Sequence, residues 1–181
     1  NIVYNYPMSD MNVVVVGLYT YFNVPVRILH PIADRIDGVK AHTIFYKNYD
    51  SNLFSLPTEK EEKLFLDTII KINPKVVAIS LLSPYVLIAQ RITELVKKHT
   101  GAVVIWGGVG PTITPDEHIK HTDVICIGEG ERAFEEIIIA VRDKKDYSNI
   151  KNLWVNDNGK ITKNPQGPLI QELDTLPFAE Y

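Results

Sequence analysis

Cysteine is almost absent from this sequence. The 181 residues contain one cysteine, Cys126, which stands inside an apolar run. A single thiol cannot close an internal disulfide, and it cannot by itself hold a zinc ion or an iron–sulfur cluster. A cysteine-built metal site is therefore excluded for this chain, and the unpaired thiol favours a reducing, cytoplasmic location.

The chain also lacks a strong net charge and a long apolar run. Its 19 basic and 22 acidic side chains leave a formal charge of −3, which gives no general attraction to nucleic-acid phosphates or anionic membranes. The longest apolar runs, at 12–22 and 135–141, fall short of the about 18 residues that a membrane span needs. The first residues show no secretory signal pattern. We therefore expect no nucleic-acid binding and no membrane span.

Short β-branched runs alternate with segments of helical periodicity. Apolar runs predict buried strands at residues 11–19, 41–47, 75–82, 102–106 and 123–127. Apolar spacing, capping residues and terminal charges predict helices at residues 24–38, 55–75, 83–101, 114–121 and 131–143. Each connection is long enough to carry a helix, so the strands should be parallel with right-handed crossovers. These patterns predict an α/β fold, a doubly wound five-stranded parallel sheet (Rossmann-like, in the flavodoxin-like order 2-1-3-4-5).

Two helices carry distinctive local patterns. Pro31 lies inside the helix expected at 24–38 and should kink it. Thr58, followed three residues later by Glu61, forms a capping-box pattern that predicts the start of a helix.

The last part of the chain has a different pattern. Residues 152–164 form two short alternating runs around Asn158-Gly159, which predicts a hairpin. Residues 165–181 contain three prolines and no period, which is typical of an extended linker. We expect a domain over residues 1–146, followed over 147–181 by a hairpin and a linker toward a further domain outside this sequence.

Four loops should meet at the carboxyl edge of the sheet, where open α/β sheets bind ligands. Glycines in these loops allow a ligand to approach the backbone closely, and hydroxyl groups can donate hydrogen bonds to it. These loops span residues 17–24, 80–85, 107–112 and 128–131. Our candidate cofactor-binding residues are Leu18, Tyr19, Thr20, Tyr21, Ser80, Leu82, Ser83, Gly107, Gly108, Gly110, Pro111, Thr112, Gly128, Glu129 and Gly130.

The sequence lacks the motifs of three kinds of site that are common in such a sheet. The phosphate loop G-x-x-x-x-G-K-[ST] is absent, and "GLYTYF" stands where a dinucleotide-binding G-x-G-x-x-G would follow the first strand. A phosphorylated receiver domain would need acidic residues after the first strand and an aspartate where Ser80 stands. A nucleotide phosphate and an acceptor aspartate are therefore both disfavoured.

The glycine turns carry a resemblance to a known family. Ser80-x-Leu82 followed by Gly107-Gly108 resembles the S-x-L and G-G pair of cobalamin-binding domains. Residues 106–137, "WGGVGPTITPDEHIKHTDVICIGEGERAFEEI", are similar to the N-terminal cobalamin-binding domain of B12-dependent radical SAM enzymes. The stretch "GPLIQELDTLPF" resembles the bridge that precedes their barrel. The resemblance extends over residues 12–178, nearly the whole chain.

This resemblance implies cobalamin as the cofactor, with its nucleotide tail beside the sheet and the serine and glycines making room for it. It also implies a radical SAM domain in cis. The [4Fe–4S] cluster and S-adenosylmethionine would belong only to that missing domain, because the C-x-x-x-C-x-x-C motif is absent here. The whole enzyme would transfer a methyl group or, like the magnesium-protoporphyrin IX monomethyl ester cyclase, close a ring oxidatively. The fragment would orient the cofactor and not be catalytic alone.

One family motif is missing. Some cobalamin domains carry D-x-H-x-x-G after the first strand, and its histidine ligates cobalt. Here that loop has no histidine. The resemblance therefore implies base-off cobalamin with no protein histidine ligand, and Tyr19, Thr20 and Tyr21 would face the lower side of the corrin.

Other interpretations stay open from the sequence. The same fold without cobalamin could serve as a docking or regulatory domain, and a flavin-binding domain is a further alternative. The i, i+3 pair His118 and His121 is expected to be solvated on its helix. Cys126 is expected to be a small core residue, and Glu131 to be an acid favoured at a helix start.

Overall fold

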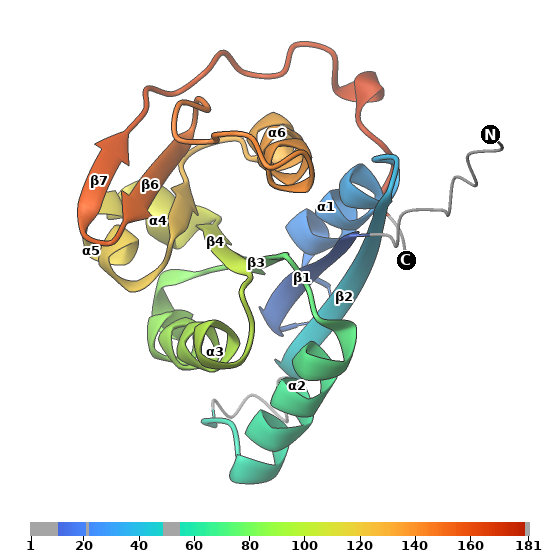
Figure 1. The fold of residues 1–181 in the computed structure, drawn as a ribbon, viewed down its shortest axis with the longest axis vertical. Helices are drawn as coiled ribbons and strands as arrows, with labels where there is room; N and C mark the ends of the chain where they lie inside the picture. The colour runs from blue at the N-terminus through green and yellow to red at the C-terminus, as the bar shows by residue number, and fades with distance from the viewer. Residues whose placement is uncertain (1–10, 21, 49–54, 180–181) are drawn as a thin grey trace, which may run out of the picture.

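The computed structural model describes residues 11–20, 22–48 and 55–179 (Figure 1). The strands are β1 (Met11–Tyr19), β2 (Val39–Asn48), β3 (Val76–Ser80), β4 (Val103–Gly107), β5 (Val124–Cys126), β6 (Leu153–Asp157) and β7 (Lys160–Lys163). The helices are α1 (Val24–Asp34), α2 (Glu59–Ile72), α3 (Val86–His99), α4 (Val109–Ile113), α5 (Pro115–His118) and α6 (Glu131–Arg142). Short 3₁₀ turns occur at Ser83–Tyr85, Ile119–His121 and Leu173–Thr175.

The seven strands form one sheet in the order β2-β1-β3-β4-β5-β6-β7. Strands β1 to β5 pair in parallel, so the predicted order 2-1-3-4-5 is confirmed. The hairpin of β6 and β7 joins the same sheet, because β6 pairs antiparallel with β5. Figure 1 shows the hairpin at the side of the sheet opposite β2, and the chain then passes back over α6. The expected division of the chain at residue 146 stays a prediction.

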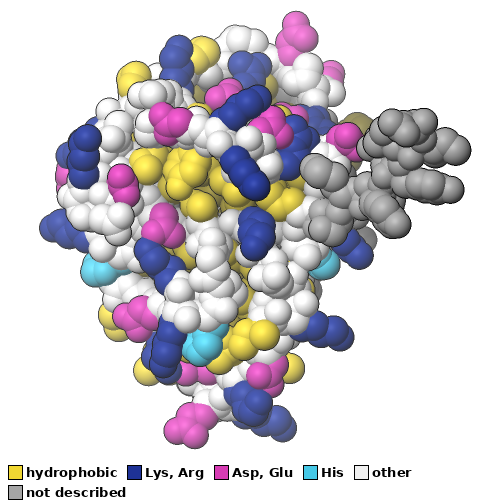
Figure 2. Space-filling view, viewed as in Figure 1, with side chains coloured by type: hydrophobic (Ala, Val, Ile, Leu, Met, Phe, Trp, Pro, Cys, Tyr) yellow, Lys and Arg dark blue, Asp and Glu magenta, His cyan; other side chains and the backbone are white. Residues whose placement is uncertain are grey.

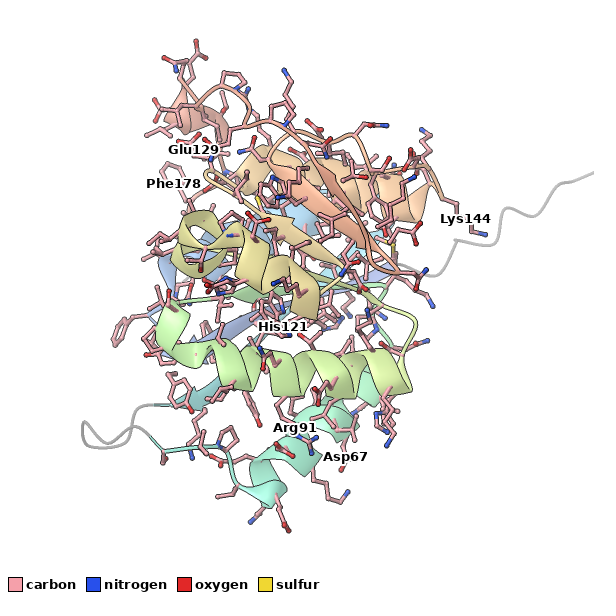
Figure 3. The ribbon with its side chains drawn as sticks, turned by 90° about the vertical axis from the view of Figure 1, so that its left-hand side faces the viewer. Asp67, Arg91, His121, Glu129, Lys144 and Phe178 are labelled. Carbon is pink, nitrogen blue, oxygen red and sulfur yellow. The ribbon has the colours of Figure 1, made fainter. Side chains whose placement is uncertain are left out.

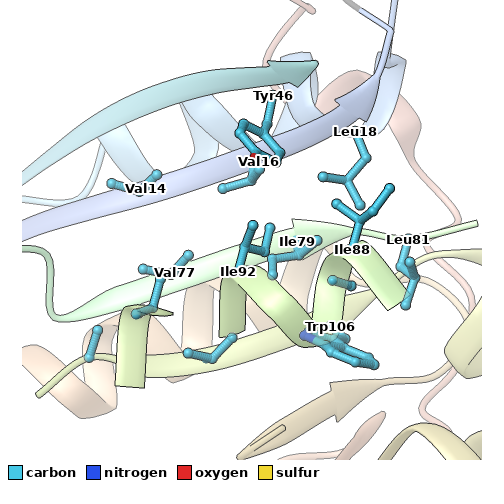
Figure 4. Packing of buried hydrophobic residues seen from close by; sticks show 14 of the residues in the cluster. Val14, Val16, Leu18, Tyr46, Val77, Ile79, Leu81, Ile88, Ile92 and Trp106 are labelled. Carbon is cyan, nitrogen blue, oxygen red and sulfur yellow. The ribbon is translucent and has the colours of Figure 1, made fainter. Parts of the chain in front are cut away.

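Two apolar cores fill the spaces on the two faces of the sheet. The continuous valine run of β1 explains both, because successive side chains of a strand point to opposite faces. Val14 and Val16 belong to the core beneath α2 and α3, whereas Val13 and Val15 belong to the core beneath α1 and α6. All four side chains are fully buried. Figure 4 shows the first core, where Ile92 of α3 points toward the sheet.

Local sequence signals place several helix ends. Thr58 and Glu61 make the predicted capping box: the Thr58 hydroxyl accepts from the Glu61 backbone N–H, and the Glu61 carboxylate accepts from the Thr58 N–H. Pro25 occupies the first turn of α1, after the cap residue Asn23. The helix continues through Pro31 as one element down to Asp34.

The segment after β4 differs from the prediction of one helix at 114–121. Helix α4 comes first, over Val109–Ile113, and the chain then bends at Thr114 before α5 and a 3₁₀ turn. Gly110 and Pro111 in α4 are poor helix formers, and for that reason the sequence pattern did not indicate this helix.

No helix among the described residues is long and apolar enough to cross a membrane. Charged side chains of both signs are interspersed over the face drawn in Figure 2, and hydrophobic side chains gather across its upper middle part.

Candidate functional site

The ends of three central strands lie in line at the carboxyl edge of the sheet. Gly17 on β1 pairs with Ser80 on β3, and Ser80 pairs with Gly107 on β4. The loop after β5 lies at the same edge, because Gly128, Glu129 and Gly130 line one cavity together with Ser80 and Gly107. Figure 3 shows Glu129 at one end of the molecule and Lys144, which follows α6, at the other. The sheet therefore brings together the loops that the sequence singled out.

A cavity of about 300 Å³ opens at this edge, on the face of the sheet covered by α1 and α6. This is the lower end of the range for small-molecule sites. The inner wall is apolar, and the outer part is lined by backbone and small polar groups. The apolar lining includes Leu29, Ala78, Ile105, Cys126, Phe134, Ile137 and Leu153. The outer lining includes Ser80, Gly107, Gly108, Gly128, Glu129 and Gly130.

At Gly108 the neighbouring backbone leaves no room for a side chain. Its φ of 102° and ψ of −163° belong to a region that is essentially restricted to glycine. A Cβ atom placed there would lie 2.9 Å from the Leu81 carbonyl oxygen. The missing side chain therefore lets β4 turn tightly beside β3 and leaves this part of the cavity mouth as bare backbone.

Thr112 forms hydrogen bonds with both glycine turns. Its hydroxyl donates to the Gly108 carbonyl oxygen at 2.8 Å and accepts from the Gly128 backbone N–H at 3.1 Å. Gly128 has a φ of 74°, in the left-handed region that favours glycine. Thr112 is therefore placed to fix the spacing of the turns after β4 and β5.

Besides Glu129, two ionisable side chains lie in the wall of the cavity. The Cys126 thiol is 7% exposed, and its burial, together with the nearby Glu131 carboxylate, raises its pKa to about 12. Glu131 begins α6, and its Oε2 atom is buried with no hydrogen-bond partner among the described residues. Most buried polar atoms in proteins have a partner. Glu131 Oε2 thus marks a place in the wall where a ligand atom could bond.

The raised pKa of Cys126 gives a direct prediction. Because the thiolate is the reactive form, we expect alkylation of the native chain at pH 8 to be at least about 100-fold slower than that of free cysteine, whose pKa is near 8.5. Mass spectrometry of samples quenched over time measures the rate. Unfolding in urea should restore the ordinary rate. Equal rates in native and unfolded protein would contradict the buried placement of this thiol.

Asn152 was not singled out by the sequence, yet it joins the β5–α6 loop to the segment after β7. Its amide donates to the carbonyl oxygens of Ile127 at 3.0 Å and Glu129 at 2.8 Å. Its own oxygen accepts from the Gly167 N–H at 2.6 Å. The Glu129 carboxylate also accepts from the Ile170 N–H at 2.7 Å. A single asparagine beside a predicted strand carries no signal of such a role.

Tyr19 and Leu18 lie in the core and not on the cavity wall. Both are 1% exposed. The Tyr19 hydroxyl donates to the Ser55 carbonyl oxygen at 2.8 Å, and its ring stacks on Tyr85 with centroids 4.6 Å apart. Thr20 accepts from the Phe22 N–H, and Tyr21 lies outside the described residues.

The other predicted residues surround the turn after β3 and the start of α4. Gly110 and Pro111 are buried, and the Gly110 N–H donates to the Leu81 carbonyl oxygen. Leu82 and Ser83 are exposed at the rim. These four residues support or border the mouth, and they are not part of the cavity lining.

His118 differs from the expectation of a solvated pair. It is 4% exposed, because α5 turns it toward Gly110 and Trp106. Its Nδ1 atom is 2.8 Å from the Thr114 carbonyl oxygen. His121 remains exposed, as predicted. Within the described parts of the chain, no group of three or more histidine, cysteine or acidic residues is arranged to hold a metal ion.

Comparison with known proteins places the chain in a family. The model of the B12 binding domain matches residues 31–138, which is more than half of the chain. An uncharacterized methyltransferase of Pyrococcus horikoshii is 29% identical over 115 residues, which cover 61% of this chain and 25% of that protein.

Two solved enzymes share the fold. The radical S-adenosylmethionine methyltransferase TsrM from Kitasatospora setae, with cobalamin and a [4Fe–4S] cluster bound, has a TM-score of 0.72 at 15% identity. The match covers 94% of this chain and 31% of that enzyme. The cobalamin-dependent S-adenosylmethionine radical enzyme OxsB has a TM-score of 0.71 at 15% identity, over 23% of its length and 90% of this chain. The chain thus spans about a third or less of these relatives, and it belongs to the B12-binding domain family.

Proposed function

We propose that this chain binds cobalamin with the nucleotide tail in the cavity beneath β3, β4 and β5. The observation that carries this proposal is the combination of an apolar inner wall with a mouth of bare backbone at Gly107, Gly108 and Gly128. A flat aromatic base needs an apolar wall, and a bulky sugar-phosphate linker needs a mouth that is free of side chains. When bound, the cofactor would supply cobalt for group transfer at its upper face.

The chain's own residues would have separate tasks. The apolar wall, including Ile105 and Phe134, would exclude water from the base. The Ser80 hydroxyl would donate a hydrogen bond to the polar linker, and the glycines at the mouth would let the linker approach the backbone. Leu82, exposed at the rim, would lie against the corrin.

Base-off binding without a histidine ligand is part of this proposal. The loop between β1 and α1 contains no histidine. The buried His118 has its Nδ1 beside the Thr114 carbonyl oxygen and packs against Trp106. A nucleotide tail in the cavity would be held away from the cobalt, and neither the β1–α1 loop nor His118 would supply a histidine ligand in its place.

The reaction of the complete enzyme is proposed from its relatives. Their names favour methyl transfer over oxidative cyclisation. A radical SAM domain in cis would supply the [4Fe–4S] cluster and S-adenosylmethionine. The segment from Pro165 onward, which leaves the hairpin and passes over α6, would lead toward that domain (Figure 1).

Equilibrium dialysis against hydroxocobalamin, followed by visible spectra of the bound fraction, tests cobalamin binding. We expect saturable binding at a ratio of one to one, with a dissociation constant no weaker than about 50 µM, or about 6 kcal/mol. The bound spectrum should show the displaced base. No retention at concentrations of about 500 µM would contradict the proposal and leave the cobalamin-free docking domain. Retention of flavin mononucleotide in its place would favour the flavin alternative.

A further inference from the structure

Glu131 is the acidic side chain of the cavity wall that the proposed function leaves unexplained. It is the first residue of α6, and it lines the cavity next to Cys126 and Gly130. Its Oε2 atom is buried and has no hydrogen-bond partner in the part of the chain that the structure describes. Burying a polar atom without a partner is costly. By contrast, Glu129 already accepts from the Ile170 N–H.

The position of Glu131 indicates which part of a ligand it would meet. The glycines and Ser80 form the mouth, and Ile105, Phe134 and Ile137 form the inner wall. The polar sugar and phosphate of a corrinoid tail would remain near the mouth, where backbone donors are available. The Glu131 carboxylate is close enough to Cys126 to raise the pKa of that thiol, and Phe134 follows Glu131 by one turn of α6. The buried Oε2 would therefore face the aromatic base.

The chemistry of the base determines what it requires of the protein. A base that has left the cobalt exposes a ring nitrogen, which is a hydrogen-bond acceptor. The protonated form of a carboxyl group can donate to this nitrogen. No lysine or arginine lines the cavity in the described structure, so a carboxylate sealed there by a ligand would be an unpaired charge. The Glu131 carboxyl group and the ring nitrogen would share one proton through this hydrogen bond, so no cation from the cavity lining is needed.

We propose that Glu131 donates a hydrogen bond to the ring nitrogen of the displaced lower base and so determines the preference of this domain for corrinoids that carry a nucleotide tail. The proposal rests on the proposed function. Corrinoid recognition would then have two separate parts. The rim of the cavity would contact the corrin whether or not a nucleotide tail is present, whereas Glu131 would contact only the base of that tail.

The test compares cobalamin with cobinamide, a corrinoid that has no nucleotide tail, on four proteins. These are the wild type, Glu131→Ala, Glu131→Gln and the matched control Glu136→Ala, which removes an exposed glutamate of the same helix. Equilibrium dialysis gives each dissociation constant. Circular dichroism and urea unfolding establish that each variant is folded.

We expect Glu131→Ala to weaken cobalamin binding by about tenfold, the effect of losing one buried hydrogen bond. Cobinamide binding should change by less than about twofold, which is within the usual effect of a surface substitution. Glu131→Gln should restore cobalamin binding to within about threefold of wild type, because its amide N–H also donates. Glu136→Ala should bind both corrinoids as the wild type does.

The outcomes separate this proposal from the proposed function. A wild-type protein that binds neither corrinoid overturns both. A wild-type protein that binds cobalamin, while Glu131→Ala binds it equally well or loses both corrinoids to the same extent, overturns the role of Glu131 alone.

Discussion

Replacing Gly108 with alanine is expected to lower the free energy of unfolding by about 3 kcal/mol and to weaken cobalamin binding by at least about tenfold. The backbone strain of a side chain at φ 102° contributes about 1–3 kcal/mol. The new Cβ would lie 2.9 Å from the Leu81 carbonyl oxygen, and this overpacking adds a comparable amount. Since the Cβ atom is fixed to the backbone of residue 108 and the oxygen is a backbone atom of Leu81, relief of the contact must move the turn that would receive the cofactor.

Gly101→Ala is the matched control for this substitution. Gly101 precedes β4, at the end of the strand opposite to Gly108. Apart from its chain neighbours, no described residue has an atom within 4 Å of the position that a Cβ atom would take there. The unfolding free energy of this variant should stay within about 0.5 kcal/mol of wild type. Urea unfolding and equilibrium dialysis of the two variants measure both effects. Equal stability and equal affinity in the two alanine variants would contradict the tight turn at Gly108.

Replacing Asn152 with alanine is the second substitution for which we expect a large effect. The change removes the amide that bonds the Ile127 and Glu129 carbonyl oxygens and the oxygen that accepts from Gly167. Three lost hydrogen bonds are expected to lower the free energy of unfolding by about 3 kcal/mol. Asn152 also has a φ of 68°, which asparagine tolerates better than alanine.

Hydrogen exchange gives a local readout of the same substitution. The amide protons of Gly167 and Ile170 should lose protection in Asn152→Ala, because their segment is no longer fixed to the loop after β5. The exposed Asn149 provides the control variant Asn149→Ala, whose exchange pattern and stability should match the wild type. Unchanged protection at Gly167 in Asn152→Ala would rule out the bridging role.

The strand order was predictable because each strand carries its own signal. The β-branched runs of β1, β3 and β4 have no polar face, as expected for strands covered on both sides, and the long crossovers dictate parallel pairing. The hairpin was also predictable from Asn158-Gly159. Its attachment to β5 was not, because β5 has only three residues and nothing local in the sequence indicates which edge a hairpin joins.

The site was partly predictable, and the differences have physical causes. The glycine turns line the cavity because their position after strands is a local property. Tyr19 could not be placed from its position at the end of a strand, because its φ of 61° and its bond to Ser55 turn the ring into the core. Asn152 could not be identified either, since its role depends on partners that only the folded chain brings near. The burial of Glu131 Oε2, on which its proposed role rests, is likewise visible only in the folded chain. His118 is buried for the same reason, through contacts across α4 and α5.

The burial of Trp106 gives the protein a built-in optical probe. This side chain is fully buried, donates from its indole nitrogen to the Thr93 hydroxyl at 2.9 Å, and immediately precedes Gly107 (Figure 4). The other tryptophan of the sequence, Trp154, lies on the hairpin with the Lys163 ammonium 4.4 Å from its ring centre. Indole emission overlaps the near-ultraviolet absorption of a corrin, so a bound corrin would accept excitation energy from Trp106. Emission quenching, compared with a variant in which Trp154 is replaced by phenylalanine, would then report occupancy of the cavity without any label.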